Sequence, residues 1–297
     1  MGFWLALGSM LCFASNIMIS RYAVSRMHVD SGFFIVLGVN IVFATLLFWI
    51  EIALRASPFA FRWKEAGLFA TGGVVGAFLG RRLLFDAVRL LGPARASVFH
   101  STAPVPTLFF AWMLVGETLR PYDLALMAVV LAGLWITQPA GKRNAPADAD
   151  RAALRRGALL GILTVTGFGA SNALRGLAMR TWEEAVFGAL LGAAAAFLMQ
   201  IVTTRDWPRV AAGFRNATRG GYALYIASGV ATVCGAILLI QATHSMEIAL
   251  AALITHTTPV AIFPISLLVL RNREGLTLRT LLGVALVLLG IALLALR

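Results

Sequence analysis

Charged residues are scarce in this sequence. Asp, Glu, Lys and Arg make up only 13% of its 297 residues, while 60% are hydrophobic and the mean hydropathy is +0.85. Soluble domains carry about 25% charged residues, so this composition excludes an ordinary soluble protein. Cysteine is equally rare. Cys12 and Cys234 both lie in apolar stretches, where cysteine is usually a small packing residue, so we expect neither a disulfide framework nor a metal site.

The long apolar runs also lack the alternation of polar and apolar residues that a membrane β-barrel requires. They are instead about twenty residues long, the length with which an α-helix crosses a hydrocarbon core roughly 30 Å thick. The sequence therefore predicts an all-α polytopic membrane protein with ten transmembrane helices. The predicted spans are 3–20, 32–54, 66–91, 94–116, 121–138, 157–179, 185–203, 221–243, 248–270 and 276–296.

Positive charge exceeds negative charge, with 25 Lys and Arg against 13 Asp and Glu. The basic residues lie in short runs between apolar blocks rather than on one domain with interleaved aromatic residues, which argues against nucleic acid as a partner. Such residues anchor helix ends to anionic lipid headgroups, so we expect membrane lipid as a partner. The first apolar block begins at Phe3 without a basic segment before it, which predicts a retained helix rather than a signal peptide. The expected location is the inner (plasma) membrane.

Motifs in the first half of the chain recur in the second half, in the same order and at a nearly constant offset of about 156 positions. We therefore predict two five-helix repeats, 1–138 and 157–297, joined by a charged linker over 139–156. An odd number of spans per repeat makes the second copy enter the membrane from the opposite side, so the repeats are inverted. The matches are Ala14-Ser15-Asn16 with Ala170-Ser171-Asn172, His100 to Pro104 with His256 to Pro259, and Glu117 and Gly133 with Glu274 and Gly290.

These motifs resemble the drug/metabolite transporter superfamily, and specifically the ten-helix exporters built from two EamA-type repeats. The resemblance covers nearly the whole chain. It implies export of small metabolites, amino acids among them, through a central cavity between the halves. It also implies cytoplasmic termini, whereas most Lys and Arg lie in loops after odd-numbered spans, which would place both termini outside the cytoplasm. The sequence leaves these two orientations open.

Two prolines, Pro104 and Pro259, lie near the middle of the fourth and ninth spans. A proline inside a helix removes a backbone hydrogen bond, so each predicts a kink or hinge whose freed carbonyl needs a hydroxyl group or cavity water. The hydroxyl residues placed to provide one are Ser101, Thr102, Thr257 and Thr258. The alternative is a packed, kinked helix that does not contact substrate.

Four further polar residues lie deep in matched apolar spans, and we expect them to face a central cavity: Asn16, Asn172, His100 and His256. Hydrogen bonding between helices is the alternative role for each. We expect the first, third, fourth, sixth, eighth and ninth spans to enclose this cavity.

The third span carries the densest charge within an apolar stretch, with Arg81, Arg82, Asp86 and Arg89. Arg82 and Asp86 are spaced i,i+4 and can pair, which leaves one arginine to meet an anion or water. We expect Arg82, or its neighbour Arg81, to bind the substrate; the alternative is that both extend to the lipid headgroups. Arg175 in the sixth span raises the same question. Glu117 and Glu274 are expected to complement the N-termini of the helices that follow them.

These features predict a secondary transporter that exports a small metabolite by alternating access, without a cofactor and as a monomer. An arginine in the cavity favours a carboxylate, so amino acids with aromatic or large aliphatic side chains are the expected substrates. The main alternative is an exporter of lipophilic cations and other drugs. The sequence lacks a P-loop, which argues against a built-in ATP motor of that type. An intramembrane enzyme is less favoured because the His-Glu-x-x-His and Gly-x-Ser-x-Gly motifs are missing, and a channel because it needs a continuous pore and usually a ring of subunits.

Overall fold

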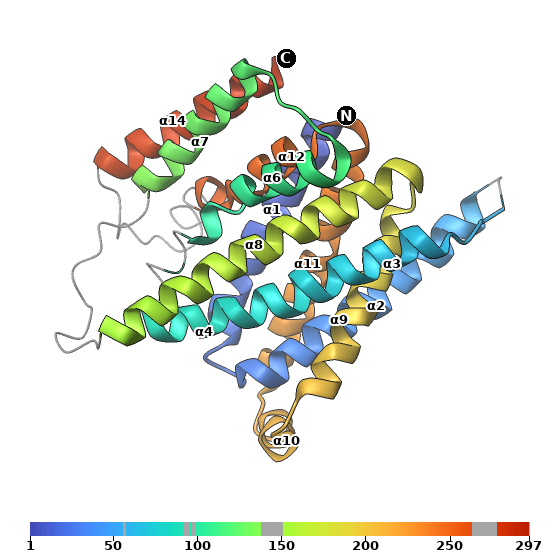
Figure 1. The fold of residues 1–297 in the computed structure, drawn as a ribbon. Helices are drawn as coiled ribbons and strands as arrows, with labels where there is room; N and C mark the ends of the chain where they lie inside the picture. The colour runs from blue at the N-terminus through green and yellow to red at the C-terminus, as the bar shows by residue number, and fades with distance from the viewer. Residues whose placement is uncertain (56–57, 92–95, 97–98, 138–150, 263–277, 297) are drawn as a thin grey trace.

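The computed structural model describes residues 1–55, 58–91, 96, 99–137, 151–262 and 278–296, and Figure 1 shows their arrangement. The regular structure in these residues is entirely helical. The helices are α1 (Gly2–Ala23), α2 (Val29–Leu54), α3 (Trp63–Gly72), η1 (Gly73–Gly80, a π-helix), α4 (Arg81–Leu91), α6 (Pro104–Val115), α7 (Pro121–Thr137), α8 (Arg151–Thr181), α9 (Ala185–Thr203), α10 (Trp207–Arg215), α11 (Arg219–Ser245), α12 (Ile248–His256) and α14 (Leu278–Ala295).

Within these described ranges, seven helices are long and apolar enough to cross a membrane: α1, α2, the continuous helix Trp63–Leu91 formed by α3, η1 and α4, α8, α9, α11 and α14. Three shorter apolar helices, Pro104–Val115, Pro121–Thr137 and Ile248–Ile262, accompany them. This confirms the prediction of an all-helical, polytopic membrane protein.

Most predicted boundaries differ from the helix ends by a few residues, and the start of the sixth span differs by six. Helix α8 begins at Arg151, inside the segment predicted as a linker, and not at residue 157. Alanine, leucine and arginine are strong helix formers, so the charged residues after Arg151 extend the membrane helix instead of interrupting it. The rest of that linker, 139–150, and Glu274 lie outside the described residues.

Close contacts between glycines set the distance between several helices. Figure 1 shows α7 and α14 side by side, and there a Cβ atom on Gly133 would lie 2.9 Å from the carbonyl oxygen of Gly283. A Cβ atom on Gly73 would overlap the backbone of Gly192, so η1 and α9 also touch through their backbones. Small residues at such positions allow helices to pack closely in lipid, where the hydrophobic effect does not drive their association.

The structure breaks the fourth and ninth predicted spans where a kink was expected. Thr102 and Ala103 form a turn, and α6 then begins at Pro104. In the second half α12 ends at His256, Thr257 forms the turn, and Pro259 lies in the first turn of the next helical segment. Each proline therefore occupies the start of a helix, where its missing N–H has no intrahelical acceptor to lose, and is not inside a bent helix.

Glu117 holds one end of the bundle together. Its carboxylate accepts hydrogen bonds from the backbone N–H groups of Ile248 (3.0 Å) and Ala249 (3.3 Å) and from Arg180 (3.1 Å). The prediction that Glu117 complements the next helix, α7, is therefore wrong, because the first turn of α12 lies against the carboxylate instead. Burial raises the pKa of Glu117, and the two N–H donors and the charge of Arg180 oppose that rise.

We expect Glu117→Gln to lower the free energy of unfolding in detergent by about 1.5–3 kcal/mol, the range for a hydrogen bond to a charged group. The amide removes the charge that Arg180 pairs with, at a site where Glu117 is only 6% exposed. The matched control is Glu183→Gln, since Glu183 is exposed and lies 3.8 Å from His244. It should change the unfolding free energy by less than about 0.5 kcal/mol. Equal losses in both variants would contradict the proposed role of Glu117.

Candidate functional site

A cavity of about 240 Å³ lies between helices of both halves of the chain. All six spans that were expected to enclose a cavity contribute to it, and so do α2 and α9. No acid is present among the described residues of its lining. The polar lining residues are Asn16, Asn40, Arg81, His100, Ser171, Asn172, Arg175, Thr232, Thr255, His256 and Thr258.

The π-helix η1 gives one wall of this cavity its shape. Gly76 and Ala77 line the cavity, and Ser171 on α8 donates a hydrogen bond of 2.6 Å to the carbonyl oxygen of Gly72. A Cβ atom on Gly76 would overlap the side chain of Ser171. The glycines therefore let α8 approach the wide π-helix closely. Interruptions of this kind are frequent at functional sites, because they turn the residues that follow, here Arg81, to a new direction.

His100 and His256 meet at the two helix breaks. Their ring centroids are 5.0 Å apart with an interplanar angle of 75°, and the ring of Phe168 lies 5.3 Å from that of His100. Both histidines line the cavity, as the sequence predicted. Nδ1 of His100 is buried without a hydrogen-bond partner in the part of the chain that the structure describes. This nitrogen remains free to bind a polar group of a ligand or a water molecule.

Two arginines line the cavity without an acidic partner among the described residues. The guanidinium of Arg81 lies 5.5 Å from the ring centre of Phe33. Arg175 packs against Gly72 and Gly192, and its Nε atom is buried without a hydrogen bond. A cation at membrane depth costs about 2.5–3.5 kcal/mol on insertion scales unless it meets an anion or water. Both groups therefore favour an anion in the cavity.

The side-chain amides of Asn16 and Asn172 each form at least one hydrogen bond with a neighbouring hydroxyl group. Oδ1 of Asn16 accepts from Ser228 at 2.6 Å and from Ser20 at 3.1 Å. Nδ2 of Asn172 donates to Thr107 at 3.3 Å. Each amide is thus oriented by a neighbour, while its other polar atom, Nδ2 of Asn16 or Oδ1 of Asn172, is left for a ligand in the cavity. Each side chain therefore bonds to another helix and also lines the cavity.

Three predicted residues do not line the cavity. Ser101 is buried, and the hydroxyl of Thr257 lies 2.6 Å from the carbonyl oxygen of Ile254 and 3.1 Å from Sδ of Met10. Arg82 donates to Thr203 at 3.2 Å and lines a separate cleft, while Asp86 pairs with Arg89 at 3.6 Å and not with Arg82. The sequence had not singled out Asn40 and Thr232, although each is a polar residue in an apolar span.

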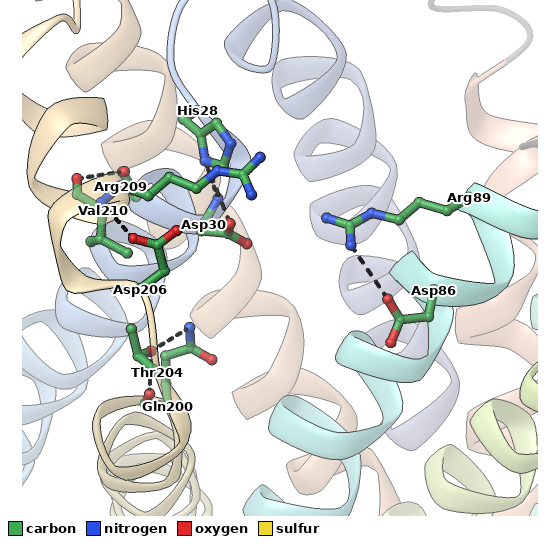
Figure 2. A network of polar contacts seen from close by, with 10 residues as sticks. His28, Asp30, Asp86, Arg89, Gln200, Thr204, Asp206, Arg209 and Val210 are labelled. Atoms are coloured by element: carbon green, nitrogen blue, oxygen red, sulfur yellow. Dashed lines mark hydrogen bonds and ion pairs between the residues drawn. The ribbon is translucent and has the colours of Figure 1, made fainter.

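The separate cleft measures about 570 Å³ and lies between α2, α4, α9 and α10. Figure 2 shows Asp86 and Arg89 on α4, across from the cluster in which Asp206 and Arg209 lie. Phe33 lines this cleft, and the guanidinium of Arg81 lies against its ring. Arg81 and Phe33 therefore separate the cleft from the central cavity.

At the opposite end of the bundle, Arg55 joins α2 to α9. Its guanidinium donates to both carboxylate oxygens of Glu184, at 2.5 and 2.9 Å, and to Glu51 at 2.8 Å. The hydrogen bonds that Arg55 donates to Glu184 raise the pKa of Arg55 above its usual range. Trp182 packs beside this ion pair against Phe59 and Phe187. This end is therefore closed by charge pairing and by aromatic packing.

Comparisons with known proteins agree with this architecture. A solved structure titled only "Crystal structure of protein" matches 99% of this chain and 96% of its own with a TM-score of 0.74 at 17% identity, which shows a shared fold. No curated protein matches the sequence. The model of the EamA-like transporter family matches residues 1–138 and 155–296. The resemblance noted in the sequence is confirmed, and the chain belongs to the EamA-like transporter family.

Proposed function

We propose that this protein is a secondary transporter that exports a small carboxylate-bearing metabolite across the inner (plasma) membrane by alternating access. The observation that carries this proposal is the cavity between the two halves, in which Arg81 and Arg175 have no acidic partner in the described lining. A single chain encloses that cavity, so we propose that the monomer is sufficient. We propose no catalytic activity, since the family is one of transporters.

We propose that ten helices form an inverted repeat, an arrangement that permits alternating access. The family model matches the chain twice, over 1–138 and 155–296, and each match covers five of the predicted spans. Halves related by a pseudo-twofold axis in the membrane plane can exchange their conformations, and this exchange moves the opening of the cavity from one side to the other. The prolines and histidines at matching helix breaks belong to this proposed repeat.

The two ends of the bundle differ, as expected for one conformation of an alternating-access cycle. Arg55 and Glu184 close one end, and the cleft lies at the other. Basic residues gather around the cleft end, among them Arg26, Arg89, Arg205 and Arg209. By the positive-inside rule this end faces the cytoplasm, so we propose that the cleft is the side from which substrate is loaded.

Amino acids are the first substrates to test. A guanidinium matches a carboxylate with two parallel hydrogen bonds, and Phe13, Phe168 and Leu84 provide apolar walls for an aromatic or large aliphatic side chain. An exporter of lipophilic cations would need an exposed acid, whereas arginine in this cavity repels a cation. Counterflow that saturates with substrate distinguishes a carrier from a channel.

Adjacent arginines provide a direct test of the site. In proteoliposomes loaded with unlabelled substrate, Arg81→Gln should reduce counterflow of a radiolabelled amino acid roughly tenfold or more, because a charge-assisted hydrogen bond contributes about 1.5–3 kcal/mol. Arg82→Gln, which alters the cleft, should have a smaller effect. Phenylalanine, threonine and a quaternary ammonium dye are compared. Transport of the dye without either amino acid would refute the proposal.

A second test concerns the closed end. In a variant without its two native cysteines, Ala189→Cys places a thiol on the cavity wall of α9. Arg55→Gln should raise the rate at which this thiol reacts with an impermeant thiol reagent added outside the cell by roughly fivefold or more, because loss of the ion pair favours opening of this end. Arg62→Gln is the control, since the guanidinium of Arg62 donates to the backbone carbonyl oxygen of Thr181 and not to Glu184. An equal rate in both variants would show that Arg55 and Glu184 do not act as a gate.

A further inference from the structure

Arg175 gives the cavity a second permanent positive charge, and it comes from the other half of the chain. Arg81 begins α4, and Arg175 lies in the last third of α8. The described acids that form ion pairs do so elsewhere, as Glu117 does with Arg180 and Glu184 does with Arg55. The described lining of the cavity therefore has an excess of two positive charges and no acid to balance either.

A substrate with one carboxylate balances only one of these charges. The amino group of a neutral amino acid would also find no acid in the described lining. A second anionic group balances the second guanidinium and removes the repulsion between the two arginines. The charge of the cavity thus discriminates between anions by their number of anionic groups, and not only between anions and cations.

The two guanidinium groups lie at different levels of the cavity. Arg175 packs against Gly72 at the end of α3, with its Nη2 atom near Gly192. Gly72 and Arg81 belong to the continuous helix Trp63–Leu91 and are nine residues apart, with the π-helix η1 between them, so their backbones lie about two turns apart along this helix. This separation suits an elongated molecule better than a compact divalent ion.

We propose that the substrate is an elongated anion with an anionic group at each end, one held by Arg81 and the other by Arg175. This inference rests on the proposed transport function and narrows its substrate class, since it favours dicarboxylates and acidic amino acids over aromatic ones. Asn16, Asn172 and the histidine pair line the same cavity as the two arginines, where they can bond to polar groups along the substrate.

The test is a counterflow series in proteoliposomes of the intact chain. Succinate, glutarate, adipate and glutamate are compared with valerate, phenylalanine, inorganic phosphate and a quaternary ammonium dye. We expect at least one dicarboxylate or glutamate to exceed valerate and phenylalanine at least tenfold. Counterflow of phenylalanine or valerate without any dicarboxylate or glutamate would overturn this inference and leave the transport proposal intact. Counterflow of phosphate equal to that of the best dicarboxylate would overturn the two-ended arrangement. Counterflow of the dye and of no other compound would refute both proposals.

Variants of Arg175 test its role directly. Arg175→Gln should lower counterflow of the best dicarboxylate at least tenfold while changing that of valerate less than threefold, so that the preference for two anionic groups is lost. Arg62→Gln, outside the cavity, should keep that preference. If Arg175→Gln does not assemble, Arg175→Lys keeps the charge but loses the forked geometry, and it should weaken the preference partly. A preference unchanged in an assembled Arg175 variant would overturn the assignment of Arg175.

Discussion

A guanidinium inside a membrane protein must meet an anion or water, and this requirement divides the arginines of this chain into two groups. At the closed end of the bundle they pair with acids, as Arg55 does with Glu184 and Arg180 does with Glu117. In the central cavity, Arg81 and Arg175 have no acid in the described lining. The first group closes the protein beside the cavity, and the second gives the cavity the positive charge on which the proposed binding of an anion rests. Guanidinium groups thus stabilise the structure in one place and carry the proposed recognition in the other.

Backbone hydrogen bonding imposes a second requirement, because lipid offers no partner for a free N–H or carbonyl group. The breaks before Pro104 and Pro259 meet it by placing each proline in the first turn of a helix. The turns are lined with hydroxyl groups, and Thr257 lies within bonding distance of Ile254 O and Met10 Sδ. As a result the histidines that precede the breaks lie in contact at the cavity, with ring centroids 5.0 Å apart.

Apolar runs of helical length predicted the membrane helices well, and polar residues isolated in those runs predicted much of the cavity. Hydropathy does not fix which way a helix faces, however, and successive residues of a helix differ by about 100°. It therefore favoured Arg82 where Arg81 lines the cavity, since the turn of η1 decides between them. Glu117 was placed at the helix that follows it in sequence, because its contact with Ile248 depends on packing between the halves.

Helix α9 connects the features on which the proposed transport depends. It begins beside Glu184 at the closed end, touches η1 where Gly192 meets Gly73, and ends at Thr203, which accepts a hydrogen bond from Arg82 in the cleft. The contact between Gly192 and Gly73 joins two backbones without intervening side chains, so neither helix can shift there without moving the other. Arg175 lies against the same pair of helices. Loss of the ion pair at Glu184 is therefore expected to affect Arg175, because Glu184 caps α9 and Arg175 of α8 packs against Gly192 of the same helix.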